Sequence, residues 1–420
     1  MDSPLVRRCR VVCLLVALVA VCSARPARAQ IVEMAEGLTL AATVSTLVSP
    51  AGSRAVGDAF QNALLLEVAT TPLGNASSGF TFTFDSELGL DDRTSATFGP
   101  SFSERARTSG AGAFSIGANL LTASYDKIGD VSLDEFELSS VLSSNPRLSR
   151  TTSASLVLSS TTLVMFGTMG VTDDFDVGVA VPFVDVGIQG ISWVESQHEN
   201  PDQRLLVNSE GGASESGLGD VELSGKYRLH QFGDKEDPPE SGGIALAVRA
   251  RVPTGSKTGL RGLGITRTAA SVIFSRSMGA ISPHANVGYE WWSDSLDIVD
   301  SSARDVFAVK GQLMYAAGVG VEVNEGFSLN VDFLGRHFGN AGRIGARSVI
   351  PDFSNPAETT VESITFLGPL SEGIRKLTLV PGLKWNLKGS VLLSLNALIA
   401  LDDNGLHDTF LPVVGLDWTF

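Results

Sequence analysis

The feature that most constrains the fold of this chain is an alternation of apolar and polar residues with a period of two, which repeats from about residue 112 to the C-terminus. In the segment 281–292 the odd positions from Ile281 to Trp291 are apolar, and the even positions from Ser282 to Glu290 are polar or glycine. Successive side chains of a β-strand point to opposite faces of a sheet. The alternation therefore predicts strands that have one apolar and one polar face.

Strand length and connection length decide between a soluble β-sandwich and a membrane β-barrel, because both classes show this alternation. The alternating segments exceed the length of about five or six residues that is usual for soluble strands, and they reach the roughly ten residues that a tilted membrane strand needs. Outer-membrane barrels also alternate short periplasmic turns with long outer loops. The connections of this chain follow that pattern, with short ones at 172–174, 277–280, 324–326 and 387–389 and long ones at 126–150, 196–216, 295–305 and 339–371.

We therefore predict an all-β fold for residues 111–420, namely a transmembrane, antiparallel, up-and-down β-barrel of about twelve strands. An even number of strands returns the C-terminus to the periplasm, as bacterial barrels require. The predicted strands lie near residues 112–125, 151–170, 175–194, 217–231, 242–253, 263–277, 281–293, 306–323, 326–338, 372–387, 389–401 and 410–420.

Aromatic residues gather at both ends of the predicted strands. Membrane barrels carry girdles of aromatic side chains at their two interfaces with water. We expect the girdle at the outer ends to contain Trp193, Trp291 and Trp292, and the girdle at the periplasmic ends to contain Phe175, Phe327, Trp385, Trp418 and Phe420.

The last predicted strand ends on an aromatic residue. Val414, Leu416, Trp418 and Phe420 share one face of this strand, and Phe420 is the C-terminal residue. This ending resembles the terminal signal that the outer-membrane assembly machinery recognises. We therefore predict that these four residues direct assembly of the barrel.

The first 29 residues have the parts of a secretory signal peptide. A basic region precedes an apolar stretch at 11–24, and Ala27 and Ala29 give the small-x-small pattern of a cleavage site, so we predict cleavage after Ala29. All three cysteines, at positions 9, 13 and 22, lie in this leader, and the mature chain would have no disulfide, thiolate nucleophile or cysteine metal site. We therefore predict an exported protein of the bacterial outer membrane.

Residues 30–110 lack the alternation of the barrel region. Residues 58–69 are predicted to form a short helix, with Phe60, Leu64 and Val68 on one stripe, and a tract rich in Gly and Ser follows it. Two interpretations of this segment stay open. It forms either an ordered periplasmic extension or extra strands at the barrel edge, or it forms a plug inside the lumen.

The net charge of −15, from 31 basic and 46 acidic residues, excludes attraction to nucleic acid through counter-ion release. We expect the partners to be outer-membrane lipid and lipopolysaccharide, the assembly machinery and a small-molecule solute. The glycine-rich runs of the sequence do not open helices as phosphate-binding loops do, and the paired Asp residues fall in turns, where Asp is common. We therefore predict no cofactor and no metal site.

Several stretches of the chain resemble one family of bacterial barrels. They are 77–85 (SSGFTFTFD), 101–106 (SFSERA), 217–228 (GLGDVELSGKYR), 251–255 (RVPTG) and 282–290 (SPHANVGYE). These stretches are similar to the outer-membrane family named for the MetA pathway of phenol degradation, whose members are often called transporters. The resemblance covers most of residues 77–420, and it implies passage of small organic solutes, including aromatic ones.

The polar faces of the predicted strands carry charges of both signs, and a barrel turns these faces toward its lumen. Asp220 and Glu222 share these faces with the basic residues. Either the basic residues attract anionic solutes such as aromatic carboxylates, or they pair with carboxylates on neighbouring strands and close the lumen. The candidate residues that line the lumen are Lys226, Arg228, Arg249, Arg251, His284, Asn286, Glu290, Lys310, Asp332, Arg336 and Lys384.

Catalysis has one candidate in the sequence, because Ser282, His284 and Asn286 follow one another on one face of a strand. That face points into the lumen, so we predict a polar row rather than a catalytic site, and no enzyme. The sequence favours a channel for passive passage of small organic solutes, aromatic or anionic. The alternatives are a non-transporting structural or surface barrel closed by paired charges and, more remotely, a hydrolase embedded in the barrel.

Overall fold

The computed structural model describes residues 39–48, 54–74, 82–85, 90–93, 97–129, 131–134, 136–141, 149–197, 205–233, 242–299, 306–339, 341, 343–349, 364–370, 373–388 and 390–419. The predicted signal peptide with its cleavage after Ala29 lies outside these residues, and so does Phe420. Among the described helices, none is long and apolar enough to cross a membrane.

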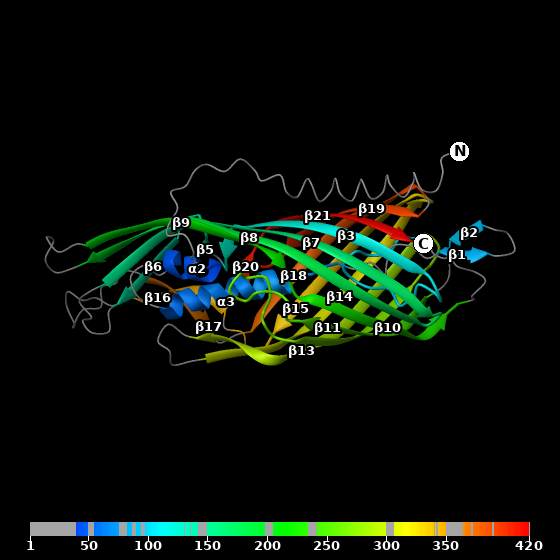
Figure 1. Cartoon of the computed structure of the whole chain (residues 1–420), viewed down its shortest axis with the longest axis horizontal. Coiled ribbons are helices and arrows are strands. Elements are labelled where there is room, and N and C mark those ends of the chain that lie inside the picture. Colours follow the sequence, from blue (N-terminus) through cyan, green and yellow to red (C-terminus); the bar gives the residue numbers. More distant parts are fainter. Residues whose placement is uncertain are drawn as a thin grey trace.

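Twelve antiparallel strands close into a barrel, which confirms the predicted fold class (Figure 1). Each strand pairs with the next one of the barrel along the chain, and the ring closes because β3 pairs with both β7 and β21. The strands of the ring are β3 (Phe114–Tyr125), β7 (Ser149–Thr172), β8 (Phe175–Gln197), β10 (Val221–Phe232), β11 (Gly242–Val252), β12 (Arg267–Arg276), β13 (Ile281–Val299), β14 (Val306–Asn324), β15 (Phe327–Phe338), β18 (Ile374–Lys388), β19 (Val391–Ala400) and β21 (Phe410–Thr419).

One connection that the sequence predicted as a long loop, 196–216, contains a strand. β9 (Leu205–Leu218) pairs with β8 from Ser196 to Phe183, and β10 pairs with the other end of β8. β9 and β10 thus pair with successive parts of the same strand, β8. The loop prediction was wrong because β9 is rich in Ser, Gly and Glu and shows no regular apolar face.

Further strands lie in the other long connections. β6 (Phe136–Val141) pairs with β7, and β16 (Arg343–Val349) pairs with β17 (Ile364–Leu370), so 126–150 and 339–371 are not wholly loops either. Two small sheets complete the described strands. One contains β4 (Lys127–Ile128), β5 (Val131–Ser132) and β20 (Leu406–His407), and the other contains β1 (Phe82–Asp85) and β2 (Leu90–Arg93).

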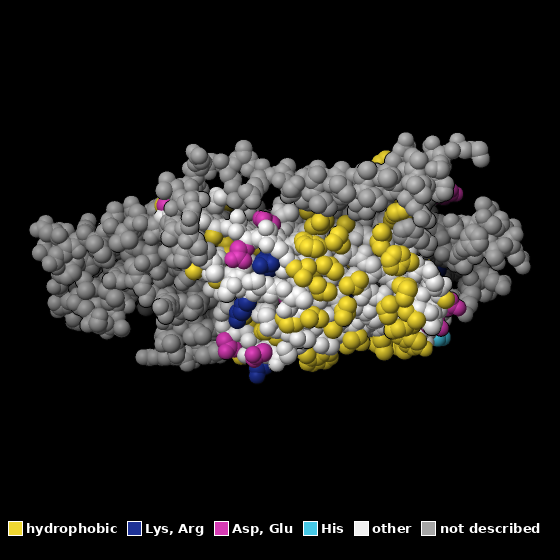
Figure 2. Space-filling model, in the orientation of Figure 1, with side chains coloured by type: hydrophobic (Ala, Val, Ile, Leu, Met, Phe, Trp, Pro, Cys, Tyr) yellow, Lys and Arg dark blue, Asp and Glu magenta, His cyan; other side chains and the backbone are white. Residues whose placement is uncertain are grey.

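The outward face of the barrel is apolar. Leu223, Val248, Val287 and Phe333 lie on four different strands and are 50–54 % exposed, and Figure 2 shows hydrophobic side chains spread over the wall. A soluble monomer rarely exposes so much contiguous apolar surface, whereas membrane barrels present such a band to lipid acyl chains. The alternation read from the sequence therefore places the correct face outside.

The predicted aromatic girdles are present in part. Trp291 and Trp385 are 53 % and 52 % exposed, as girdle residues should be. Trp292 is an exception, because it is 7 % exposed and its Nε1 donates a hydrogen bond to Glu290 Oε1 at 2.7 Å. Trp292 lies opposite Arg267 in the regular pairing of β12 with β13, on the same inward face as Glu290, so the alternation itself turns it into the barrel. The side chains of Trp193 and Phe420 lie outside the described set.

Two helices fill the end of the barrel at which the long connections lie (Figure 1). α2 (Leu40–Val48) contacts β8 and β9, and α3 (Arg54–Thr70) contacts β13. Phe60 and Leu64 of α3 are buried in one hydrophobic cluster with the inward residues Leu156 and Ile188. The short helix predicted at 58–69 is thus part of α3, and this end of the lumen is apolar rather than polar.

Residues 97–111, which we call the internal strap, run inside the barrel. Its hydrogen-bond partners lie on the inner faces of separate strands. Phe98 N donates to Ser328 Oγ at 3.3 Å, and Ala106 N donates to Ser275 Oγ at 3.0 Å. Of the two interpretations of the N-terminal segment, the described residues place the strap and both helices in the lumen.

Candidate functional site: the lumen cavity

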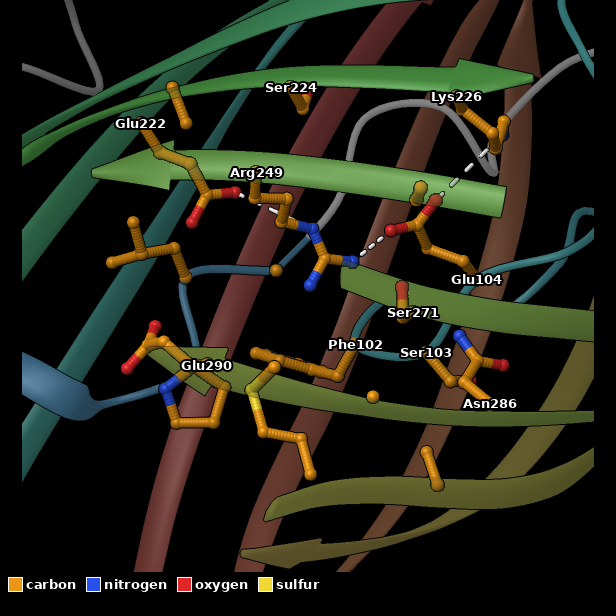
Figure 3. A pocket seen from close by; sticks show the side chains of 18 of the residues that line it. Phe102, Ser103, Glu104, Glu222, Ser224, Lys226, Arg249, Ser271, Asn286 and Glu290 are labelled. Atoms are coloured by element: carbon orange, nitrogen blue, oxygen red, sulfur yellow. Dashed lines mark hydrogen bonds and ion pairs between the residues drawn. The ribbon is translucent and has the colours of Figure 1, made fainter. Parts of the chain in front are cut away.

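A cavity of about 170 Å³ lies inside the barrel, between the internal strap and the inner faces of β7, β8 and β10 to β15. The strap contributes Phe102, Ser103 and Glu104 to its lining, and β11 contributes Arg249 (Figure 3). Arg251 of β11 also lines the cavity. The two arginines reach the cavity because inward positions recur at every second residue of a strand, whereas the strap residues reach it because the strap runs inside the barrel. The cavity is therefore lined by residues that are far apart in the sequence and close together in the folded barrel.

The pairing of β10 with β11 explains which charges meet. Arg251 lies directly opposite Glu222, and Arg249 lies opposite Ser224, one pair further along the ladder. Side chains opposite each other on neighbouring antiparallel strands are in contact distance. Accordingly Arg251 Nε is 2.6 Å from Glu222 Oε2, and Arg249 Nε is 3.7 Å from Glu222 Oε1.

Glu104 of the strap joins this ladder from the middle of the lumen. Its carboxylate accepts a hydrogen bond from Arg249 Nη2 and lies 3.9 Å from Lys226 Nζ (Figure 3). Lys226 is also 3.8 Å from Asp176 Oδ2 on β8. Asp176 in turn accepts a hydrogen bond from the backbone N–H of Ser109 at 3.0 Å. The strap is thus held at two points by the charges of the wall.

Glu290 lies at the centre of a second polar group in the wall. It accepts hydrogen bonds from Trp292 Nε1 and from Gln312 Nε2 at 2.9 Å, and it lies 3.9 Å from Arg267 Nη1. Arg267 is 1 % exposed and is 3.3 Å from Asp220 Oδ2. Each of these charged side chains therefore has an opposite charge within 4 Å.

The charges that line the cavity balance. Four are cationic and four are carboxylates, and most of them face a partner of opposite sign. The eight are Lys226, Arg249, Arg251, Arg336, Glu104, Asp176, Glu222 and Glu290. Apolar side chains lie between them, among them Phe102, Phe166, Met314 and Leu334. A solute in the cavity can therefore make apolar contacts and can interact with fixed dipoles. The lining charges do not sum to the excess positive charge that a ladder of basic residues would supply.

The predicted row of Ser282, His284 and Asn286 does not assemble into a nucleophile and its base. His284 Nε2 lies 2.5 Å from Asp332 Oδ1, and the Ser282 hydroxyl donates to Ser277 Oγ at 3.4 Å instead of to His284. A serine nucleophile needs a base within hydrogen-bond reach of its hydroxyl. The geometry therefore supports a structural row.

This row holds the strap. Ser103 Oγ donates to Asp332 Oδ1 at 3.0 Å, beside the contact between Asp332 and His284. The carboxamide of Asn286 lies against the backbone of Glu104, and in the amide orientation that satisfies both groups its nitrogen donates to the Glu104 carbonyl oxygen at 3.0 Å and its oxygen accepts from the Glu104 N–H at 2.8 Å. Two of the candidate lumen residues, Asp332 and Asn286, thus contact the strap, and His284 contacts Asp332.

Arg336 and Lys384 also bind the N-terminal segment. Arg336 Nη1 donates to the Thr70 carbonyl oxygen at 2.6 Å, and Lys384 Nζ donates to the Pro100 carbonyl oxygen at 3.2 Å. The last carbonyl groups of a helix, such as that of Thr70, and those of a non-helical segment need other partners when they are buried. These two cations supply such partners inside the barrel.

The remaining two candidates lie away from the cavity. Arg228 forms an ion pair of 2.6 Å with Asp174, at the end of the barrel where the short turns lie. Burial and the nearby charge of Arg228 lower the pKa of Arg107 to about 10. Lys310 is exposed, and its neighbour Val309 is fully buried. The register shift between β13 and β14 turns Lys310 outward, so its assignment to the lumen needs correction.

Sequence reasoning did not identify Glu104 or Asp176 as site residues. Asp176 occupies an inward position of β8, which the alternation could have indicated. Glu104 lies in the irregular strap, where no period shows which way a side chain points. Its role depends on where the strap lies within the barrel, and this is a long-range property.

Comparisons with known proteins find similar folds only. No family model and no curated protein matches the sequence. Among solved structures, an outer membrane channel from Pseudomonas putida F1 is 13 % identical over 75 % of this chain and 98 % of that chain, with a TM-score of 0.43. The TodX monoaromatic hydrocarbon channel, as a mutant, is 9 % identical over 74 % and 91 % of the two chains, with a TM-score of 0.31. A BenF-like porin from Pseudomonas fluorescens Pf-5 is 7 % identical over 74 % and 98 %, with a TM-score of 0.28.

Proposed function

We propose that this chain is an outer-membrane channel for small, neutral organic solutes of about the size of one aromatic ring, closed by the internal strap in the conformation described. The observation that carries the proposal is the cavity of about 170 Å³ in the middle of the barrel. An apolar cavity of about 150 Å³ is large enough to bind benzene. Phe102 and Phe166 supply flat apolar surfaces for such a ring.

The balance of charge favours neutral over anionic solutes. An anion that approached Arg251 would have to replace Glu222, which already lies 2.6 Å from the guanidinium. Displacing one member of a buried ion pair leaves its former partner uncompensated, which is costly. A neutral solute does not disturb the pairs, and its polar group can use the dipoles of Ser224 or Ser271 at the cavity wall.

The strap supplies the closure. Small apolar contacts at Phe98 and Ala106 attach it to the wall. Most of its described contacts to the wall are hydrogen bonds and ion pairs, such as those of Glu104 to Arg249 and of Ser103 to Asp332. Each such contact contributes little net free energy when water can replace it. The strap can therefore leave its place at a smaller cost than a segment held by a packed hydrophobic core.

The outer wall and the last strand suit a channel of the bacterial outer membrane. The apolar outer wall suits the lipid and lipopolysaccharide of a bacterial outer membrane, and the face shared by Val414, Leu416 and Trp418 suits recognition by the assembly machinery. The resemblance to the family named for phenol degradation favours aromatic solutes among those of suitable size. The proposed role is transport without catalysis.

The test is conductance and solute uptake by the purified full-length protein in lipid vesicles and planar bilayers. Glu104→Gln removes the charge that fixes the strap, and we expect this variant to open more often than the wild type. Because the variant leaves one excess cation in the cavity, the solute preference is measured in the wild type, which should pass phenol faster than benzoate. Glu215→Gln is the matched control, because Glu215 pairs with Arg261 at 3.7 Å and does not line the cavity. Faster uptake of benzoate than of phenol would contradict the preference for neutral solutes.

A second candidate function, a non-transporting structural barrel, is favoured by the pairing of charges around Glu104 and Glu222. In that case the strap is a permanent part of the core. Neither the wild type nor Glu104→Gln would then conduct ions or admit solutes, while both would remain folded. This outcome would reject the channel and support the structural barrel.

A further inference from the structure

A second polar site lies on a part of the inner wall that does not border the cavity, where β15, β18 and β19 run side by side. Asn330, Gly382 and Asn396 occupy paired positions on these three strands. A Cβ added to Gly382 would clash with Asn396 Oδ1 and would lie 2.8 Å from Asn330 Nδ2. Both carboxamides therefore lean over the glycine and converge on one point of the wall.

The two carboxamides are buried without partners. Asn330 and Asn396 are 3 % and 7 % exposed, and none of their four amide nitrogen and oxygen atoms has a hydrogen-bond partner in the described part of the chain. Buried amide groups are nearly always hydrogen-bonded, and each exception calls for an explanation. Among the described residues, these are the only two carboxamides with both polar atoms in this condition.

The internal strap passes over this site. Phe98 N contacts Ser328, and Ser103 Oγ contacts Asp332, so the strap residues between them lie at the level of Asn330. One of them, Ser101, is 4 % exposed, and its hydroxyl likewise has no partner among the described residues. A group placed between the strap and the wall would find hydrogen-bonding atoms on both sides.

The site lies on the way from the cavity to the short-turn end of the barrel. Leu334 lines the cavity, and Asn330 is four residues nearer to the start of β15, which corresponds to about 13 Å along the strand. The charged groups around Lys384 are Asp332, Asp417 and Arg105 of the strap, which together with Lys384 make two cations and two carboxylates. The surroundings therefore favour neither an anion nor a cation.

We propose that Asn330 and Asn396 form a hydrogen-bonding subsite for a neutral solute group that both donates and accepts, for which a primary carboxamide is the closest match. Each asparagine amide offers one donor group and one acceptor, and a primary carboxamide presents the complementary pair. Gly382 is part of the site because only a residue without a side chain leaves room for both amides. The inference rests on the proposed channel only for the route by which the solute arrives.

Benzamide is the probe for this subsite. A ligand that binds only the folded protein raises its unfolding temperature. We therefore expect benzamide to raise the unfolding temperature of the full-length protein in detergent micelles. Toluene has the same ring without the amide, and benzoate replaces the amide by a charge, so neither should have this effect.

Two variants test the residues. Asn396→Leu removes one amide, and Gly382→Ala keeps both but forces them apart; we expect each to weaken benzamide binding by about tenfold or more. Asn386→Leu is the matched control, because Asn386 also has a buried amide oxygen without a partner but lies elsewhere on β18, and it should bind benzamide as the wild type does. Heat-modifiable migration in electrophoresis verifies that each variant is folded.

The outcomes separate this inference from the proposed function. Equal benzamide affinity in the wild type, Gly382→Ala and Asn396→Leu, or no binding to the wild type, would overturn the subsite whether or not the protein conducts. Benzamide binding that both variants lose, in a protein that shows no conductance, would support the subsite and reject the channel. The two hypotheses thus fail independently.

Discussion

Replacing Arg249 and Arg251 together by Gln is expected to destabilise the barrel rather than to change its ion selectivity. Arg251 lies 2.6 Å and Arg249 lies 3.7 Å from the Glu222 carboxylate. The double substitution removes both cations that face Glu222. Glu104 loses Arg249 but keeps Lys226 at 3.9 Å.

The magnitude follows from these partners. Removing one member of a buried ion pair costs about 3–5 kcal/mol, because the other charge stays buried without compensation. Arg249 and Arg251 are 28 % and 14 % exposed to the cavity, so water screens part of this cost. We therefore expect the free energy of unfolding to fall by about 3 kcal/mol, the lower end of the range, with most of the loss at Glu222.

The assay is urea-induced unfolding of the protein in lipid vesicles, followed by tryptophan fluorescence. The matched control adds Glu222→Gln to the double variant. Because this removes the stranded carboxylate, it should restore most of the lost stability. The reversal potential in a salt gradient is measured for the wild type and for the double variant, both with Glu104 in place, and we expect little change.

The opposite result has a clear meaning. Unchanged unfolding free energy, together with a loss of anion preference in the reversal potential, would show that the two arginines face the solute instead of Glu222. The interpretation of the lumen charges as paired would then be refuted. The hypothesis of a basic ladder that attracts anions would replace it.

Three further predictions concern topology, assembly and the wall. A cysteine at position 207 should react with an impermeant thiol reagent on intact cells, and one at 325, in a short turn, should not; the reverse labelling would contradict the orientation. Deletion of Phe420 should leave degraded periplasmic protein, so normal amounts of heat-modifiable barrel in the membrane would disprove its role in assembly. Trp292→Phe should lower the free energy of unfolding by about 1.5–3 kcal/mol, because the indole donates to the buried Glu290 carboxylate, and an unchanged urea midpoint would count against that bond.

The barrel itself could be predicted from the sequence because its pattern is local. A residue lies on the same face of a strand as the residue two positions away. The sequence therefore predicts the faces of β10, β13 and β15 without the strand pairing. Departures occurred where that period is interrupted. β9 has no regular apolar face, and the register shift after Trp291 turns Lys310 outward. Trp292, in contrast, follows the alternation and faces inward with Glu290.

The contents of the lumen could not be predicted in the same way. The sequence left open whether residues 30–110 lie in the periplasm or inside the barrel, and whether the lumen charges are paired. Both answers depend on Glu104, which meets Arg249 across a sequence separation of 145 residues. No periodicity in the strap indicates this contact, because the strap forms neither a helix nor a strand and its path depends on its contacts with the barrel wall.

The sequence by itself thus determined the class of fold, the strands and the side of the wall on which most side chains lie, since a period of two fixes these residue by residue. Only the tertiary structure decided that the strap occupies the lumen, that Arg249 and Arg251 are paired, and that Asn330 and Asn396 meet over Gly382. These features arise from closure of the ring, which brings positions that are far apart in the chain to one level of the barrel. The alternation predicts the face on which a residue lies, and ring closure determines which residue it meets.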